Sequence, residues 1–260
     1  MPDDDVEPIP VTRLDDRGAV ELVERGDPDD PVDEVLARLG APLDEVMLTQ
    51  RAVRKVRFDA VDDRIVLRAI ELALKAPTGS NGQNWEFVVV KDRETKAEFA
   101  SVYRRAWSIY GGLGRRMTRG DDTMGKVLAA VEWQVDHFED IPVLVVACLR
   151  GSRVPLLPMP PIANTSYYGS IYPSVQNLLL AARAMGLGAS LITLPLLSVV
   201  HTRRILGLPM AVTPACIVPL GWPRGRYGPT TRRPVGDVVH LETFGNQPWK
   251  ASGSGPADIG

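Results

Sequence analysis

Two short stretches of the sequence carry side chains suited to an anionic, flat ligand. The first, residues 49–55, contains Arg51 and Arg54, whose spacing of three predicts that they share one helix face and could grip a phosphate together. The second, residues 76–85, is a run of Pro, Thr, Gly, Ser, Asn and Gln that ends in a Trp. Its backbone N–H groups and short polar side chains can hydrogen-bond the polar edge of such a ligand.

Each stretch also has a plainer interpretation. Lys55 and Arg57 extend the positive charge, and a basic run is usually a solvated face. The second stretch has the composition of an ordinary turn between a helix and the apolar run that starts at Trp85. The occurrence of both motifs in this order favours a binding site over two unrelated turns.

The hydrophobic pattern predicts the elements that position these stretches. Helices are expected at about residues 30–40, from residue 44, at 63–75, at 93–108, at 123–138 with glycines 111–114 in between, at 170–185 and at 199–206. Strands are expected at 85–90, 142–149, 190–194 and 215–220, with 142–149 apolar on both faces and therefore central. Residues 151–165 are Pro-rich and irregular. The pattern predicts an α+β or α/β fold with four or five strands.

The two stretches together resemble the flavin-binding signature of the nitroreductase family. That family has an Arg-Arg-Ser-x-Arg-like motif, matched here by Arg51 and Arg54. Its second motif is Pro-Ser-x-x-Asn-x-Gln-Pro-Trp-like, matched here by Pro77, Thr78 in place of Ser, Asn81, Gln83 and Trp85. Ala52 stands where Ser is common and Asn84 where Pro is usual, so one hydroxyl and one rigid turn are missing. The resemblance continues to about residue 240.

The resemblance implies an α+β fold with a small mixed or antiparallel sheet flanked by helices, formed as an intertwined homodimer around helix 170–186. It implies bound FMN, with Arg51, Arg54 and Arg232 on the phosphate and the 77–83 loop on the flavin across the dimer interface. Residues 186–195 would lie behind the ring, although a helix cap leading into a buried strand explains them equally well. The cofactor-binding residues so implied are Arg51, Ala52, Val53, Arg54, Pro77, Thr78, Gly79, Asn81, Gln83, Thr193, Leu194 and Arg232.

The implied activity is ping-pong transfer of hydride from NAD(P)H through FMN to a small-molecule acceptor such as a nitroaromatic or a quinone. No side chain is expected to be catalytic, because the flavin carries the redox step. Tyr103, Trp107, Tyr110, Tyr167 and Tyr168 either line the acceptor pocket or pack in the core. Arg115, Arg116 and Arg119 either favour NADPH or are solvated. Relatives with other flavin chemistry (ene reduction, dehalogenation, flavin fragmentation) remain alternatives, as does a flavin-sequestering or regulatory protein without turnover.

The composition fits this class of protein and excludes others. The chain has 260 residues, 45% of them hydrophobic, and a net charge of −2. Residues 1–46 hold 15 acidic and 4 basic side chains, whereas the remainder holds 17 and 26, an excess that favours anionic ligands. We expect an acidic arm with a short helix at 1–43, a single FMN-binding domain at 44–243 and a flexible tail at 244–260.

Several other classes lack their signatures. No Gly-x-Gly-x-x-Gly, P-loop or nucleophile elbow occurs, and His137, His201 and His240 are isolated, so no metal site is expected. Cys148 and Cys216 lie in apolar runs and are expected to be buried thiols. No signal peptide, membrane-spanning stretch or nucleic-acid motif is apparent, so a cytoplasmic protein that binds neither membrane nor nucleic acid is predicted.

Overall fold

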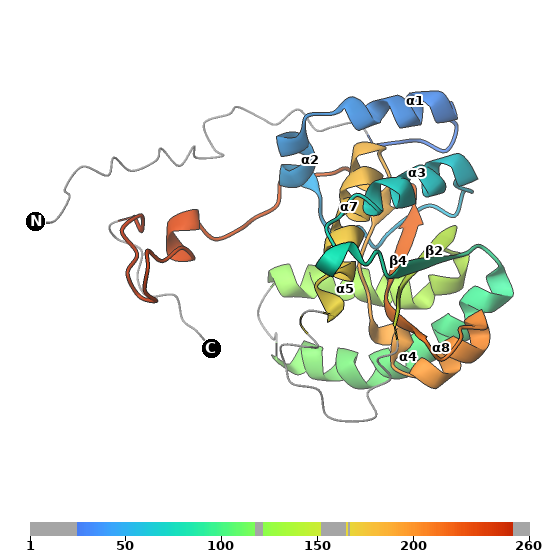
Figure 1. Cartoon of the computed structure of the whole chain (residues 1–260). Helices are drawn as coiled ribbons and strands as arrows, with labels where there is room; N and C mark the ends of the chain where they lie inside the picture. Colours follow the sequence, from blue (N-terminus) through green and yellow to red (C-terminus); the bar gives the residue numbers. More distant parts are fainter. Residues whose placement is uncertain (1–24, 118–121, 152–164, 166, 252–260) are drawn as a thin grey trace, which may run out of the picture. The chain divides into compact units, whose positions relative to one another are not determined.

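The structure is a computed structural model of the whole chain, and it describes residues 25–117, 122–151, 165 and 167–251 (Figure 1). The chain divides into two compact units. One runs from Val23 to Gly228, and the other contains Pro229–Gly260 together with Met1–Leu22.

The larger unit is built on a four-stranded antiparallel sheet with the order β1-β2-β4-β3. The strands are β1 (Trp85–Val90), β2 (Val143–Arg150), β3 (Gly188–Ala189) and β4 (Val212–Gly221). Strand β2 is central and all but its last residue are buried, as its continuous apolar sequence predicts. The predicted α+β class with a small sheet flanked by helices is confirmed, and every strand pair in it is antiparallel.

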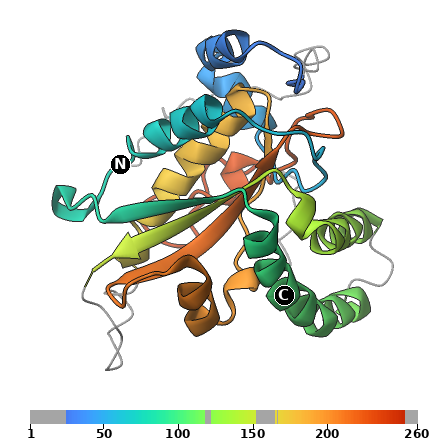
Figure 2. The same ribbon diagram turned by 90° about the vertical axis from the view of Figure 1, so that its right-hand side faces the viewer.

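Alternate residues of β2 belong to two hydrophobic cores, one on each face of the sheet. Val143, Val145 and Ala147 pack with α3 and α7, whereas Leu144 and Val146 pack with α4 and α5. Figure 2 shows the sheet between these two helical layers. The helices are α1 (Val32–Ala37), α2 (Leu43–Thr49), α3 (Asp63–Ala73), α4 (Arg93–Met117), α5 (Asp122–Asp136), α7 (Ile171–Ala184) and α8 (Val199–Leu206). Short 3-10 turns are η1 (Arg38–Gly40), η2 (Gly79–Asn81), η3 (Phe138–Asp140) and η4 (Leu194–Leu196).

Three of the sequence-based expectations about secondary structure are wrong. The segment Gly111-Gly112-Leu113-Gly114 does not separate two helices, because α4 continues through it to Met117. Gly111 lies against the indole of Trp107, one turn earlier in the helix. A Cβ at position 111 would lie only 2.8 Å from Trp107 Cε2, so the absence of a side chain leaves room for the indole. Residues 190–194 do not form a strand. Only Ile192 bridges Ile217, and η4 begins at Leu194 with Pro195 next to it.

The arginine motif also differs from its expected local structure. Helix α2 ends at Thr49, and residues 51–55 form neither a helix nor a strand, so Arg51 and Arg54 do not share a helix face. The reason is tertiary. The N–H of Val53 donates to the carbonyl of Ala189 at 2.9 Å, and Val56 forms a β-bridge with Pro223. These contacts hold a non-helical chain in a region where an isolated i, i+3 pattern would favour a helix.

The described part of the C-terminal unit contains the short turn η5 (Val235–Asp237), followed by a loop in which the N–H of Leu241 donates to the carbonyl of Asn246. His240 stacks on Phe244 with ring centroids 4.4 Å apart. Arg232 lies at the start of this unit, is exposed, and donates to the carbonyl of Thr231.

The two cysteines are buried free thiols, as expected, and they lie on opposite faces of the sheet. Burial raises the pKa of each thiol to about 12. We expect neither thiol to react with an aromatic disulfide reagent at pH 8 in the folded protein, because the thiolate is the nucleophile and hardly any is present. Both should react in denaturant, and a spectrophotometric thiol count checks this. Rapid labelling of the native chain would contradict it.

Candidate functional site

The segment that carries the first motif is held on both sides by backbone hydrogen bonds. Val53 is bonded to Ala189 beside β3, and the N–H of Arg57 donates to the carbonyl of Trp222 at 2.7 Å. The N–H of Arg224 donates to the carbonyl of Lys55, and its Nε donates to the carbonyl of Val56. The backbone between residues 53 and 57 is therefore held in place, and with it the Cα of Arg54, while Arg51 lies two residues before the first of these bonds.

The two arginines occupy different environments. Arg51 is exposed, and its Nη1 lies 4.0 Å from the position that a Cβ on Gly228 would take. Arg54 is half-buried, and its buried Nε has no hydrogen-bond partner. Desolvation lowers the pKa of this guanidinium, while the nearby Tyr103 opposes that shift. A partly buried cation with a free donor favours an anionic or carbonyl-bearing ligand beside it.

A buried polar network that the sequence reasoning missed lies next to Arg54. The Tyr103 hydroxyl lies 3.5 Å from Gln134 Oε1, and Gln134 Nε2 donates to Ser190 Oγ at 3.0 Å. All three residues are almost completely buried, and burial raises the pKa of Tyr103 to about 12. Tyr103 thus belongs to the core under the site. The sequence does not indicate that Gln134 is buried, since a single Gln in an amphipathic helix is normally expected on the exposed face.

The second motif forms an exposed loop with unusual backbone geometry. Ser80, Asn81 and Gln83 all have positive φ values, of 52°, 52° and 45°. Non-glycine residues rarely adopt this conformation, and when they do they tend to occur at functional sites. Thr78 Oγ1 accepts from the N–H of Gln83, and Gln83 Nε2 donates to Asn81 Oδ1. The loop is therefore shaped by its own side chains, while its amides still face solvent.

The two motifs lie at opposite ends of the sheet within one chain. The 77–83 loop leads into Trp85, which is opposite Leu149, whereas the arginine segment joins Ala189, which is opposite Leu220. Leu149 and Val143, the partner of Leu220, are at the two ends of β2, about 20 Å apart at 3.3 Å per residue. Helix α7 connects the same two ends: Ser170 at its start accepts from the N–H of Gly79, and Gly186 follows its end.

The other predicted site residues are distributed as follows. Thr193 is exposed and Leu194 half-buried, both just after Ile192, which bridges Ile217 in the middle of β4. Ala52 is exposed and Val53 half-buried within the first motif, and Pro77, Thr78 and Gly79 open the second. Arg232 belongs to the C-terminal unit. The side chains of Arg115, Arg116 and Arg119 lie outside the described residues.

The five candidate aromatic residues do not form one cluster in the chain. Tyr103 is buried in the core on the α4 side, Trp107 is half-buried there, and Tyr110 is exposed. Tyr167 and Tyr168 pack against the core on the opposite face and contact each other edge to face. Within the described part of the chain, therefore, packing accounts for Tyr103, Tyr167 and Tyr168.

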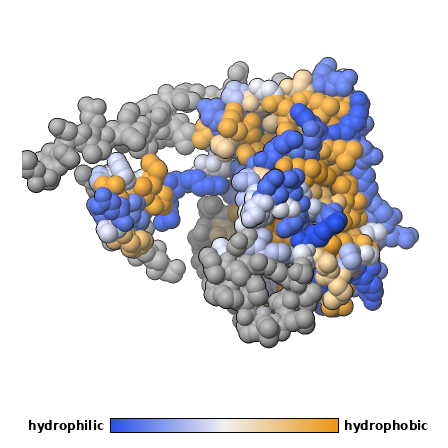
Figure 3. All heavy atoms as spheres, in the orientation of Figure 1, coloured by the Kyte–Doolittle hydropathy of each residue, from blue (hydrophilic) through white to orange (hydrophobic). Residues whose placement is uncertain are grey.

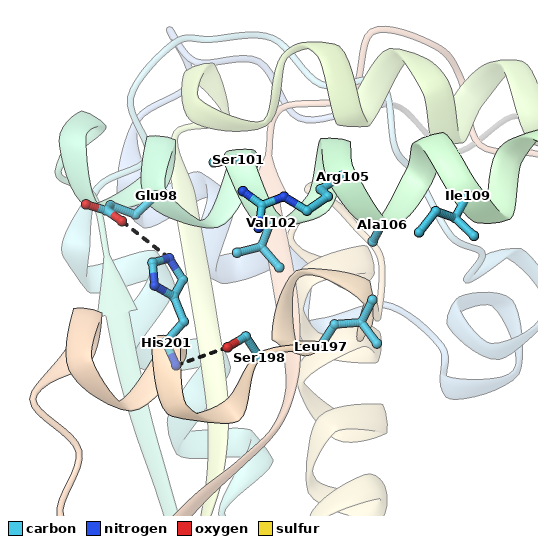
Figure 4. Close-up of a pocket in the computed structure, with 9 residues that line it drawn as sticks. All are labelled: Glu98, Ser101, Val102, Arg105, Ala106, Ile109, Leu197, Ser198 and His201. Atoms are coloured by element: carbon cyan, nitrogen blue, oxygen red, sulfur yellow. Dashed lines mark hydrogen bonds and ion pairs between the residues drawn. The ribbon is translucent and has the colours of Figure 1, made fainter.

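A separate pocket of about 380 Å³ lies between α4 and the start of α8 (Figure 4). None of the predicted cofactor residues lines it. Ser198 Oγ accepts from the N–H of His201 and caps α8, and His201 Nε2 pairs with Glu98 at 3.3 Å. His137 Nδ1 lies 2.8 Å from the carbonyl of Trp133, and His137 stacks on that indole. The described histidines thus have capping and packing contacts, as the sequence indicates.

Gly188 provides a specific test of the backbone around the arginines. A Cβ at this position would lie 2.7 Å from Val53 Cγ1 and 3.2 Å from Val53 Cβ. We expect Gly188→Ala to displace the 51–54 segment and to lower the free energy of unfolding by about 1–3 kcal/mol. Urea unfolding measures this. Gly40→Ala is the matched control, because a Cβ at Gly40 meets no atom within 4 Å. Equal stability of the two variants would contradict the tight packing described.

Comparison with known proteins gives the class of this chain. The sequence model of the Nitroreductase family matches residues 47–222, which include both motifs and the whole sheet. The chain therefore belongs to the nitroreductase family, and the resemblance drawn from the two motifs is confirmed.

Individual relatives are distant but cover most of the chain. It is 26% identical over 205 residues to a protein named putative NADH dehydrogenase/NAD(P)H nitroreductase from Methanothermobacter thermautotrophicus, covering 77% of this chain and 86% of that protein. It is also 26% identical to iodotyrosine deiodinase 1 of Rattus norvegicus over 75% of this chain and 67% of that protein. An iodotyrosine deiodinase crystal structure, bound to FMN and 3-iodo-L-tyrosine, has the same fold, with a TM-score of 0.59 and 20% identity over 78% of this chain and 100% of that one.

Among the described residues, no helix combines the length and apolar character needed to cross a membrane. The same part of the chain contains no group of three or more His, Cys, Asp or Glu side chains placed to hold a metal ion.

Proposed function

We propose that this protein is an FMN-dependent oxidoreductase that takes hydride from NAD(P)H and passes it to a small acceptor. The observation that carries the proposal is the arginine segment, in which a half-buried guanidinium with a free donor lies beside an exposed one on a fixed backbone. Relatives named for NAD(P)H-dependent reduction, and an FMN-bound protein of the same fold, support it.

The residues present suit FMN. Arg51 is exposed and free to reach a phosphate, for which a guanidinium fork is well matched. The buried Nε of Arg54 would gain an acceptor on binding. Ala52, Val53, Thr193 and Leu194 would also contact the cofactor, and Arg232 stays a predicted phosphate ligand. The chemistry that bound FMN supplies is the acceptance of hydride from a nicotinamide and its return to a nitroaromatic or quinone in a second half-reaction.

The separation of the two motifs supports a homodimer. In a two-fold dimer with α7 packed antiparallel against its copy, the start of α7 in one chain lies beside the end of α7 in the other. The 77–83 loop of one chain would then meet the arginine segment of its partner, with Asn81 and Gln83 offering their amides. Helix α7 is about 21 Å long at 1.5 Å per residue, which spans the distance between the motifs.

An apolar surface fits this arrangement. Helices α2, α3 and α7, with the residue that ends α3, carry exposed apolar side chains, namely Leu43, Met47, Leu67, Leu74 and Tyr172. Figure 3 shows apolar residues gathered over this part of the larger unit. Large exposed apolar patches mark protein interfaces. A second copy is the occupant that would also complete the cofactor site.

Reductive dehalogenation of a halogenated aromatic is the second candidate activity, favoured by the similarity to iodotyrosine deiodinase 1 over 75% of the chain. The same flavin site would serve both reactions. Product analysis with a nitroaromatic, a quinone and a halogenated phenol, each supplied to the reduced protein, distinguishes them. A flavin-sequestering protein would turn over none of the three.

Reconstitution with FMN tests whether the protein binds the proposed cofactor. Purified protein, stripped of any flavin and mixed with FMN, should quench flavin fluorescence with a stoichiometry of one FMN per chain. Size-exclusion chromatography with light scattering should give the mass of a dimer. Protein that binds no FMN contradicts the proposed function, and monomeric protein that binds FMN fully contradicts the shared site.

A further inference from the structure

Arg183, in the last turn of α7, is a buried cation that the cofactor site does not use. Only 3% of its surface is exposed, and its Nε and Nη2 are buried without hydrogen-bond partners. No carboxylate among the described residues forms an ion pair with it. The carbonyl end of a helix favours a positive charge, but it gives no acceptor to these two donors. An uncompensated buried guanidinium is costly enough to require a counter-charge or an acceptor.

Two further unpartnered buried donors, on Tyr227 and Arg38, belong to residues near the end of α7 that carries Arg183. Its guanidinium carbon lies 3.8 Å from the centroid of the Tyr227 ring, and the hydroxyl of Tyr227 is buried without a partner. Burial raises the pKa of Tyr227 strongly, while Arg183 and Arg38 both act to lower it. Arg38 Nη1 lies 3.3 Å from the position that a Cβ on Gly186, just after α7, would take. Arg38 Nη1 is also buried and unpartnered. Buried polar groups nearly always have partners, so several missing ones in one place indicate an unfilled site.

The carboxylates in this region do not accept hydrogen bonds from the unpartnered donors. Asp30 pairs with Arg38 through Nη2, at 2.9 Å, and leaves Nη1 free. Glu45 on α2 interacts electrostatically with Arg183 but forms no hydrogen bond with its free donors. Unpartnered buried donors therefore come from three separate parts of the chain, and no described acceptor pairs with any of them.

We propose that Arg183, Arg38 and Tyr227 form a binding site for a small monovalent anion, of halide or formate size, inside the larger unit. The two guanidinium groups supply charge-assisted N–H donors, and the phenol supplies an O–H donor. The anion would join η1, the end of α7 and the segment before Gly228, and so stabilise the folded chain. This site does not depend on the proposed FMN function.

Thermal unfolding of the purified protein, in whatever cofactor state it is isolated, tests the site. Sodium chloride is exchanged for sodium gluconate, a bulky monoanion, at constant ionic strength. We expect chloride to raise Tm by about 3–6 °C in a saturable manner, because an anion that binds only the folded state stabilises it by mass action. Formate should act like chloride. A Tm that does not change with the anion overturns the proposal.

Single-residue variants test whether the chloride dependence of Tm comes from this site. Arg183→Met should remove most of the chloride dependence, and Tyr227→Phe, which keeps the ring under Arg183, should weaken it several-fold. Arg64→Met is the control for charge, since the Arg64 side chain is 61% exposed, and should leave the dependence intact. Glu45→Gln should leave or strengthen it. If Arg183→Met does not fold, Tyr227→Phe decides alone: an unchanged chloride response in that variant overturns the site.

Discussion

Arg54→Met should weaken FMN binding by about ten- to a hundred-fold, and Arg51→Ala should do the same. Hydrogen bonds to charged groups are among the stronger ones in proteins, and the loss of one corresponds to a change of this size in affinity. Arg54 is half-buried with a free Nε, so its loss also removes a donor that water reaches poorly. Methionine keeps the apolar stem in place. Fluorescence titration of flavin-free protein with FMN gives both dissociation constants.

The control for this pair is Arg64→Met, which removes the same charge from the exposed side of α3. Its dissociation constant for FMN should stay within about two-fold of wild type, since exposed charges contribute little at physiological salt. If all three variants bind FMN equally well, the arginine segment is not the cofactor site, whatever the family.

Trp222→Ala should lower the free energy of unfolding by about 3–5 kcal/mol, the range for removing a large buried aromatic side chain. Trp222 is 2% exposed, and its Nε1 donates to the carbonyl of Ala60 at 3.0 Å. Its own carbonyl accepts from the N–H of Arg57, so the variant also loosens the backbone that carries Arg51 and Arg54. Urea unfolding measures the stability, and the FMN titration measures the second effect.

Two further variants test whether the loss of stability in Trp222→Ala comes from the buried indole. Trp222→Phe keeps most of the volume and loses the hydrogen bond, so it should cost about 1–2 kcal/mol. Phe244→Ala removes an aromatic ring that is 87% exposed and should leave stability nearly unchanged. A Trp222→Ala protein as stable as wild type would show that the packing around residues 57–60 does not depend on this indole.

Much of the fold follows from local patterns. The apolar runs at 85–90 and 142–149 and the helical periodicity at 170–185 and 199–206 gave elements that match β1, β2, α7 and α8 closely. The errors arise where tertiary contacts override local preference. Residues 51–55 are not helical, and Val53 there donates a hydrogen bond to Ala189. Helix α4 continues through its glycines, and Gly111 there packs on Trp107.

The candidate site is less accessible from sequence than the fold. Arg51 and Arg54 are recognisable as candidates by their charge, and the 77–83 loop by its composition. Neither pattern predicts that the arginine segment and the loop lie at opposite ends of the sheet. That fact requires the strand register. Gln134, Ser190 and Arg183 escape detection because a single polar residue in an amphipathic or apolar stretch gives no signal of burial.

The central claim is that FMN in this protein exchanges electrons with a nicotinamide and then with an acceptor. Anaerobic titration of the FMN-loaded protein with NADPH, and separately with NADH, followed by visible absorbance, tests it directly. We predict that the flavin absorbance bleaches with one equivalent of a nicotinamide and recovers when a nitroaromatic or quinone is added. Absorbance that stays unchanged with both nicotinamides would contradict the account and favour a flavin-sequestering protein.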